Sequence, residues 1–203
     1  MERFASVCRH TEETKVDVEI LLDGTGNREI STGIPFFDHM LNLFAVHGFF
    51  DLKVEAKGDI DVDFHHTVED VGIVLGNAVS KALGEKVGIR RYGFALTPMD
   101  EALARSVIDL SNRPYLVFKV PPVAASETGF GVQLAKEFFR AFAVNAGMTL
   151  HINVEYGENE HHVIESVFKS VIESVFKSVA RALDMAVGLD DRITGQLSTK
   201  GCI

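Results

Sequence analysis

Two short motifs with paired histidines carry the clearest chemical signal in the sequence. Residues 65–69 read HHTVE and residues 161–165 read HHVIE, so a glutamate follows each pair at the same spacing. In a helix, residues three or four positions apart lie on one face, which places the first histidine of each pair beside its glutamate. Adjacent residues diverge by about 100° around the helix. The two histidines of a pair are therefore expected to face two different sites, each suited to a metal ion.

Two further histidines lie in segments that favour defined positions. Pro35 begins an amphipathic run that favours a helix carrying His39. His151 lies on an expected strand, where Leu150 and Ile152 would point toward the core and the histidine toward the other face. Imidazole and carboxylate ligands without thiolates suit Mn, Fe, Ni or Zn, and the residues alone leave this choice open.

The elements that must position these side chains recur twice along the chain. Residues 43–70 and 141–166 share a Phe-Ala-Val run, an alternating apolar and polar strand, a Gly-containing turn and the paired histidines. Each copy predicts a helix, short strands and then a helix that begins with the histidine motif. With strands and helices grouped rather than strictly alternating, the sequence predicts an α+β fold of two fused similar half-domains. The halves span about residues 1–87 and 88–203 of a single domain.

Composition limits the class of protein. The chain has 203 residues, 46% of them hydrophobic, and a net charge of -9, which argues against a nucleic-acid partner. No apolar run approaches the length of a membrane span, and the N-terminal MERFASVCRHTEETK has no apolar core of a signal peptide. Cys8 and Cys202 lack metal-type spacing. We therefore expect a cytoplasmic protein without membrane or nucleic-acid partners, able to hold a small anion in a local basic pocket.

Many further motifs occur in a fixed order along the chain. They are RHTEETKV, LLDGTG, GIPFFDHML, DFHHTVED, ALGEKVGIRRYG, PMDEALARSVIDLSNRPYL, GMTLHINVEYGENEHH, IESVFK and LSTKG. With these motifs the sequence resembles the imidazoleglycerol-phosphate dehydratase family over essentially its whole length. One departure is Asn112 in SNRPYL, where the family usually has glycine.

The resemblance implies a hydro-lyase, a lyase of histidine biosynthesis that converts imidazoleglycerol phosphate to imidazoleacetol phosphate. It implies helices packed between two β-sheets, and a homo-oligomer in which trimers assemble into a 24-subunit shell with metal sites at subunit contacts. It also implies manganese as the cofactor, with two ions per subunit. Carried over residue by residue, the metal ligands are His39, His65, His66, Glu69, His151, His161, His162 and Glu165.

The resemblance also assigns residues to the reaction. Glu13 is implied as a general acid or base and His47 as a substrate contact. The ligand carboxylates Glu69 and Glu165 join this catalytic set. By its spacing alone, Glu13 would be an ordinary surface charge. Cationic and hydroxyl groups suit the phosphate of a small phosphorylated imidazole substrate. The implied phosphate contacts are Arg91, Arg113, Lys169, Ser198 and Lys200.

The chemistry of this reaction explains why metal ions are needed. The substrate loses a C–H proton next to an imidazole ring, with no carbonyl group to acidify it, and a Lewis acid on the ring nitrogens can supply that acidity. Two alternatives remain open from the residues alone. One is another metal-dependent enzyme, such as a hydrolase that uses metal-bound hydroxide. The other is a metal-storage or shell-forming protein, which needs neither the arginines nor the LSTKG segment.

An eight-residue repeat follows the second histidine pair. Residues 163–170 and 171–178 both read VIESVFKS, and removal of one copy leaves the family pattern. The repeat is therefore interpreted as a tandem duplication with residues 171–178 as the insert. Eight residues add about 12 Å and about 80° of rotation to a helix. The insert must therefore loop out or displace the residues that follow it.

We expect the first copy to keep its place behind the histidine pair, with Glu165 and Lys169 in register. Glu173 and Lys177 would then be decoys, and the insert would thread into the helix. The expected result is weakened substrate binding, weakened assembly or both. The residues displaced from their positions would be Val179, Ala180, Ala182 and Leu183, replaced by Val171, Ile172, Ser174 and Val175.

Overall fold

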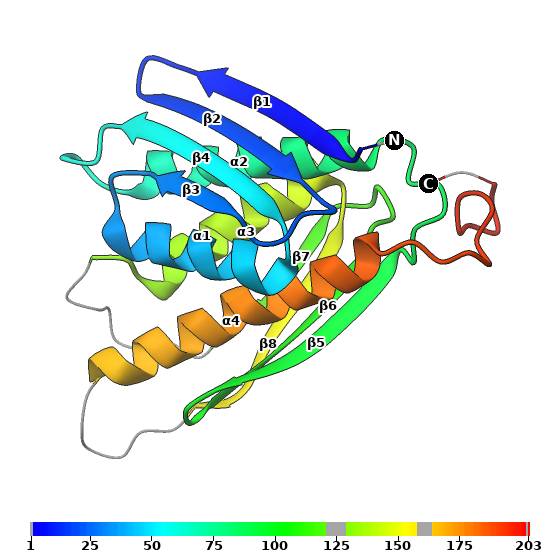
Figure 1. Ribbon diagram of the computed structural model, residues 1–203. Coiled ribbons are helices and arrows are strands. Elements are labelled where there is room, and N and C mark those ends of the chain that lie inside the picture. Colours follow the sequence, from blue (N-terminus) through cyan, green and yellow to red (C-terminus); the bar gives the residue numbers. More distant parts are fainter. Residues whose placement is uncertain (1, 121–128, 158–163, 202) are drawn as a thin grey trace.

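The computed structural model describes residues 2–120, 129–157, 164–201 and 203, with the side chains of residues 157–170 outside the description. Within these residues, two four-stranded sheets enclose four helices (Figure 1). The first half contains β1 (Phe4–His10), β2 (Thr14–Leu21), β3 (Arg28–Ser31), α1 (Pro35–Gly48), β4 (Asp51–Gly58) and α2 (His65–Leu83). The second half contains β5 (Tyr92–Met99), β6 (Ala102–Asp109), β7 (Tyr115–Lys119), α3 (Val132–Ala146), β8 (Thr149–Gly157) and α4 (Ile164–Val187). None of the described helices is long and apolar enough to cross a membrane.

The two sheets have the same topology. Their strand orders are β1-β2-β4-β3 and β5-β6-β8-β7, and in each sheet the last pair of strands is parallel while the others are antiparallel. Each half also follows the same order of elements: three strands, a helix, a strand and a helix. The predicted α+β fold of two similar halves is therefore confirmed, and its helices lie between the two sheets (Figure 1).

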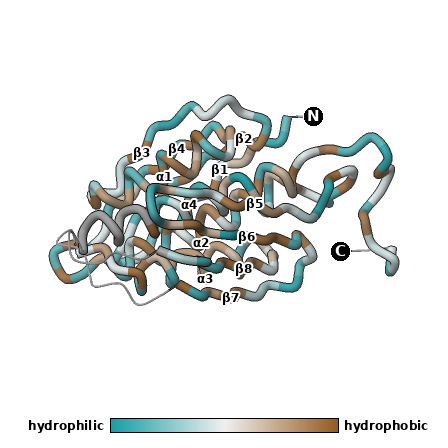
Figure 2. The backbone as a smooth tube through the Cα atoms, turned by 90° about the horizontal axis from the view of Figure 1, so that it is seen from below, coloured by the Kyte–Doolittle hydropathy of each residue, from teal (hydrophilic) through white to brown (hydrophobic). Residues whose placement is uncertain are grey.

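Alternating side chains give each sheet one buried face. In β2, Val16, Val18 and Ile20 are buried while the residues between them are exposed, as the two-residue period of a strand requires. β6 shows the same alternation. Figure 2 shows the resulting mixture of hydrophobic and hydrophilic residues along the backbone of both sheets. The buried faces turn toward the helices, where the core lies.

Each half closes its sheet with its own last helix. α2 packs against β1 and β2, α4 packs against β5 and β6, and the halves meet where α2 packs on α3 and α1 packs on α4. The contact between α2 and α3 is close because a glycine faces it: a Cβ atom on Gly72 would lie 2.7 Å from the carbonyl oxygen of Phe138. The rings that fill the space between α1, α3 and α4 are Phe37, Phe44, Phe138, Phe142 and Phe176.

The C-terminal part of α4 keeps its own packing despite the repeat. The backbone N–H of Arg91 donates to the carbonyl oxygen of Ala186 at 2.9 Å, and that of Arg90 donates to the carbonyl oxygen of Gly188 at 2.8 Å. The prediction that the insert displaces this part of the chain is wrong. Both sets of residues are buried, Val179, Ala180, Ala182 and Leu183 in their own positions and Val171, Ile172, Ser174 and Val175 one copy earlier.

Packing in the C-terminal half of α4 explains this register. Displacement by one copy would place Ile172 at the position of Ala180, which is fully buried, and the ring of Phe176 at the position of Asp184, which is partly exposed. Overpacking of a core position costs about 1–3 kcal/mol, and a phenylalanine at a partly exposed position loses the stabilisation of burial. Extension of the helix at its N-terminal end avoids both effects, and α4 has 24 residues where α2 has 19.

Candidate metal and active site

The first histidine motif begins α2. His65 is the first residue of the helix, and its Nε2 lies 3.6 Å from Oε2 of Glu69, one turn later. Both side chains are partly exposed. This is the same-face pair that helical spacing predicts. Nη2 of Arg140 on α3 lies 3.5 Å from the other oxygen of Glu69 and places a positive charge beside the carboxylate.

His66 lies next to two carboxylates from other elements. Its Nδ1 is 3.0 Å from Oδ2 of Asp59 and 3.7 Å from Oε2 of Glu13, which lies between β1 and β2. The hydrogen bond to Asp59, followed by the charge of Glu13, raises the pKa of His66 above its ordinary value. A carboxylate at one ring nitrogen fixes the orientation of the imidazole and leaves Nε2 for a metal ion.

The fold brings Glu13 into this cluster, although its spacing in the sequence predicted an ordinary surface charge. Asp59 was missed by the sequence analysis. It directly follows Gly58, the last residue of β4, and precedes His66 by seven positions. An acidic residue after the turn glycine, shortly before a histidine pair, is the signal that could have found it. Its Oδ1 is buried and has no hydrogen-bond partner among the described residues.

The contact between α1 and α4 forms another histidine–carboxylate pair. α1 begins at Pro35, as predicted, and carries His39, whose Nε2 lies 3.2 Å from Oε1 of Glu173. Glu173 is almost fully buried, and Nζ of Lys177 lies 3.2 Å from its Oε2. Glu173 of the second copy, which was predicted to be a decoy together with Lys177, therefore lies beside the predicted ligand His39.

Four predicted residues lie where no side chain is described. His161 and His162 lie outside the described residues. Glu165 and Lys169 lie in the first turns of α4, for which the backbone alone is described. The roles of these four residues therefore stay predictions.

His47 lies in the last turn of α1, close to two cations of α4. Burial, and then the charges of Lys177 and Arg181, lower the pKa of His47 below its ordinary value. The residue lines a pocket together with Arg90, Arg181 and Asp184. A neutral imidazole among cations suits an anionic or polar ligand. The assignment of His47 as a substrate contact stays a prediction.

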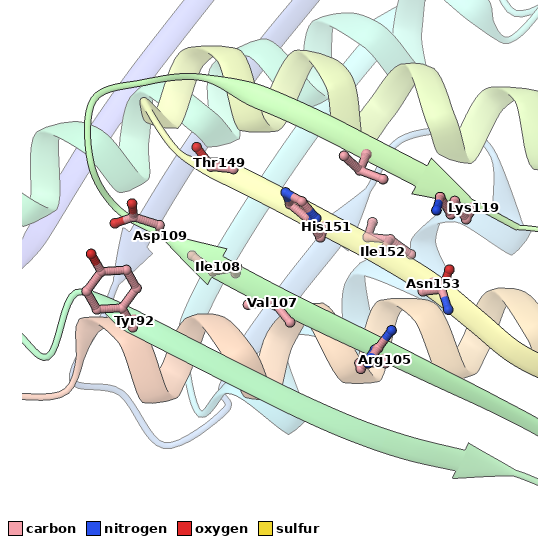
Figure 3. Close-up of a pocket in the computed structure, with 11 residues that line it drawn as sticks. Tyr92, Arg105, Val107, Ile108, Asp109, Lys119, Thr149, His151, Ile152 and Asn153 are labelled. Carbon is pink, nitrogen blue, oxygen red and sulfur yellow. The ribbon is translucent and has the colours of Figure 1, made fainter.

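His151 lies on the exposed face of the second sheet, as the alternation along β8 predicts. Leu150 and Ile152 on either side are fully buried. His151 lines an open pocket of about 430 Å³ together with Arg105 and Lys119 (Figure 3). The predicted metal ligands of one chain therefore lie in separate places, with His151 on the outer face of a sheet and the described others on the helices.

Two of the predicted phosphate contacts, Arg91 and Arg113, converge on Asp109 at the edge of this pocket. Arg91 is buried; its Nε donates to Oδ1 of Asp109 at 2.7 Å, and its Nη1 donates to the carbonyl oxygen of Leu197 at 2.5 Å. Nη2 of Arg113, which is exposed, lies 3.4 Å from Oδ2 of Asp109. The contact to Leu197 anchors the LSTKG segment near both arginines.

Asn112 keeps the turn at the position where the family usually has glycine. Its φ is 53°, a left-handed conformation that asparagine tolerates better than most residues. Its Oδ1 accepts a hydrogen bond from Lys86, and its Nδ2 donates to the carbonyl oxygen of Ile203 at 3.1 Å. Within the adjacent segment, the backbone N–H of Lys200 donates to Oγ of Ser198 at 3.2 Å. The side chain of Asn112 thus helps to hold the C-terminal segment.

Comparison with known proteins decides the family. A family model described as imidazoleglycerol-phosphate dehydratase matches residues 32–183. The imidazoleglycerol-phosphate dehydratase of Desulfosudis oleivorans is 75% identical over 203 residues, which cover 100% of both chains. The chain belongs to the imidazoleglycerol-phosphate dehydratase family. The prediction of an enzyme, a hydro-lyase, is confirmed by this membership.

Two solved structures of imidazoleglycerol-phosphate dehydratases share the fold. The Staphylococcus aureus structure matches with a TM-score of 0.78 at 36% identity, over 92% of this chain and 99% of that chain. The Pyrococcus furiosus structure, in complex with (S)-C348, matches with a TM-score of 0.81 at 37% identity, over 97% of this chain and 99% of that chain. Both half-domains are therefore part of the shared architecture.

The donor atoms of this member of the imidazoleglycerol-phosphate dehydratase family suit a divalent cation. Imidazole nitrogens and carboxylate oxygens without thiolates are compatible with manganese. No group of three or more His, Cys, Asp or Glu side chains able to hold an ion forms within the described part of the chain. A site with more ligands needs donors from beyond that part. Among the described residues, the predicted histidine ligands form the pairs His65–Glu69, His66–Asp59, His66–Glu13 and His39–Glu173.

Proposed function

We propose that the chain catalyses the manganese-dependent dehydration of imidazoleglycerol phosphate to imidazoleacetol phosphate in histidine biosynthesis. Its relatives are named as dehydratases of this substrate. The observation that carries the proposal is the cluster around His66, where Asp59 and Glu13 lie at one ring nitrogen. A carboxylate that orients the candidate metal ligand and a candidate acid–base group thus both lie within contact distance of His66.

The proposed metal ligands are positioned mainly by the starts of helices. The first turn of α2 positions His65, His66 and Glu69, and Asp59 orients the ring of His66. Manganese, at two ions per subunit, would supply Lewis acidity at the imidazole ring of the substrate. The other proposed ligands are His39, His151, His161 and His162, together with one glutamate of the VIESVFKS repeat, Glu165 or its counterpart Glu173.

Glu13 is the proposed group for proton transfer. Its side chain is 61% exposed and its carboxylate lies 3.7 Å from His66. A bound substrate can therefore reach it from solvent while it stays beside the metal-ligand cluster. A positioned carboxylate of this kind accepts a C–H proton and returns a proton later in the reaction, and general acid–base catalysis contributes about 100- to 10,000-fold.

Arg113 and the LSTKG segment are the proposed phosphate site. The side chain of Arg113 is 66% exposed, and its contact with Asp109 is long, at 3.4 Å. Donors therefore remain for the oxygens of a phosphate group. Arg91 is buried and bonded to Asp109 and to Leu197, so in this arrangement it positions the segment rather than facing solvent.

The proposal places the metal sites at contacts between copies of the chain. His151 opens onto the outer face of the second sheet, whereas His39 and His65 lie on α1 and α2. No group of three donors forms within the described part of one chain. Contacts between copies can bring ligands from both places together. The proposed assembly is a homo-oligomer built from trimers, up to the 24-subunit shell of the family.

Conversion of the substrate tests the proposal. Protein treated with a chelator and reloaded with manganese should convert imidazoleglycerol phosphate to its ketone product, whereas the chelated protein should not. Release of inorganic phosphate instead would indicate a hydrolase. Manganese binding without turnover, unaffected by Arg113→Ala, would indicate a metal-storage or shell-forming protein. Either result would contradict the proposed function.

A further inference from the structure

The repeat gives α4 two identical sets of side chains for one position in the core. Residues 163–170 and 171–178 have the same sequence, and eight helical residues span about 12 Å. One copy at a time can therefore lie beside His39 on α1. Local sequence does not choose between the copies, because each side chain of one copy has an identical counterpart in the other.

The helix α2 provides an internal reference for this choice. When residues 67–83 of α2 are aligned with residues 171–187 of α4, the last residues of the two helices coincide. Every residue that is buried in this part of α2 then has a buried counterpart in α4. Glu69 and Glu173 occupy equivalent positions in the alignment. Glu173 of the second copy is thus the counterpart of the glutamate in the first histidine motif.

The same alignment shows what this register lacks. The positions of His65 and His66 in α2 correspond to those of Lys169 and Ser170 in α4. With Glu173 beside His39, α4 therefore has the glutamate of the motif at the expected position but no histidines at the two positions that correspond to His65 and His66. Imidazole is a favoured ligand for divalent transition metals, whereas protonated lysine is not a ligand. Within the aligned residues, α4 therefore offers fewer donor side chains than α2.

Contacts along α4 hold the second copy in place. The ring of Phe176 is fully buried, with its centroid 4.7 Å from that of Phe139. The Oγ atoms of the buried residues Ser178 and Ser106 lie 2.6 Å apart. Ala186 and Gly188, at the end of α4, accept backbone hydrogen bonds from Arg91 and Arg90. The first copy could repeat the first two contacts, but it would move the end of the helix away from the third.

We propose that Glu173 of the second copy, and not Glu165, is the carboxylate that acts with His39 in this chain. Lys177 holds this carboxylate from the other side, with its Nζ 3.2 Å from Oε2. The register follows from packing alone. The role of Glu173 as a metal-site carboxylate rests in addition on the proposed function. The α4 side of the site then binds manganese through fewer histidines than the α2 side.

Two matched phenylalanine variants test the register in the full metal-free chain. Phe176→Ala removes a fully buried ring and should lower the melting temperature by about 10 °C, whereas Phe168→Ala should lower it by less than about 3 °C. Both variants change the same residue in the same local sequence, so differences in helix propensity cancel. Equal losses, or a larger loss in Phe168→Ala, would overturn the register.

Two matched glutamate variants test the metal role. Manganese titrations by calorimetry should show binding weakened by about tenfold or more in Glu173→Gln and changed by less than about twofold in Glu165→Gln. The reverse order, or unchanged binding in Glu173→Gln, overturns the role of Glu173. Absence of manganese binding in the unsubstituted chain overturns this role together with the proposed function, and the phenylalanine pair still decides the register.

Discussion

Asp59 shows how a single residue sets the chemistry of the His66 cluster. Its hydrogen bond to Nδ1 is the main reason that the pKa of His66 lies above its ordinary value of 6.5. In the metal-free protein, a raised pKa means stability that is fully present below the unfolded pKa and is lost as the pH rises through the folded pKa. Manganese needs the neutral ring. Protons therefore compete with the metal at a higher pH than they would for an ordinary histidine.

Asp59→Asn should shift this competition to lower pH. Manganese affinity should fall as the pH decreases toward the raised pKa of His66, and the variant should keep its affinity to a lower pH because the main cause of the shift is gone. Manganese titrations between about pH 8 and pH 5.5 measure the difference. Asp17→Asn, which alters a carboxylate beside the exposed His10, is the control. Identical profiles for the two variants would contradict the role of Asp59.

Among the elements, α4 is the one in which the residues that pack into the core and the histidines expected to bind metal lie in different parts of the sequence. Its second repeat copy packs into the core, while the histidine pair at residues 161–162 precedes the first copy in the sequence. Removal of residues 171–178 and removal of residues 163–170 produce the same chain. In that chain the histidine pair directly precedes the remaining copy. In the first half of the molecule, His65 and His66 directly precede the corresponding residues of α2 in the same way.

This deletion should restore the donors that the present register lacks. The histidine pair would take the positions that Lys169 and Ser170 now hold, so kcat/KM should rise substantially and manganese should bind more tightly. The buried contacts of the remaining copy are kept, so the melting temperature should change by less than about 3 °C. Steady-state kinetics and calorimetry measure these effects. If activity and metal affinity both stay the same, the repeat has no effect on the site and this prediction is contradicted.

At the scale of the whole molecule, the second half has an exposed apolar surface. The strands of the second sheet carry large hydrophobic side chains that are about half exposed or more, which is typical of a surface that contacts another protein. His151 lies on the same sheet face as part of this surface (Figure 3). Burial of this surface between copies would agree with the proposed assembly. The exposed residues are Tyr92, Phe94, Leu96, Val107, Tyr115 and Tyr156.

Assembly should depend on the histidine motifs. If the metal sites lie between copies of the chain, His65→Ala should reduce the particle size, because a lost ligand weakens a metal-mediated contact. His161→Ala should reduce it less, because the register that brings Glu173 to His39 lacks the second histidine pair. Light scattering in the presence of manganese measures the particle. His10→Ala is the control, since His10 pairs with Asp17 and belongs to neither motif. A large particle that is unchanged in both variants would place the metal sites away from subunit contacts.

The sequence by itself determined the features that depend on short-range periodicity. Helical spacing predicted the pairing of His65 with Glu69, and strand alternation predicted the exposed position of His151. The internal repeat of motifs predicted two similar halves, and the order of the motifs was sufficient to recognise the family. These inferences succeed because the periods of helices and strands assign side chains to faces without knowledge of distant residues.

The tertiary structure alone decided the contacts between distant segments. Glu13 and Asp59 reach His66 from separate loops, and no local pattern indicates that meeting. The register of α4 is a stronger case, because two identical copies have identical local preferences. The choice depends on where Ala186 and Phe176 pack, and these contacts join residues far apart in the sequence. Long-range packing discriminates between arrangements that local sequence leaves equal, and it brings Glu173 to His39.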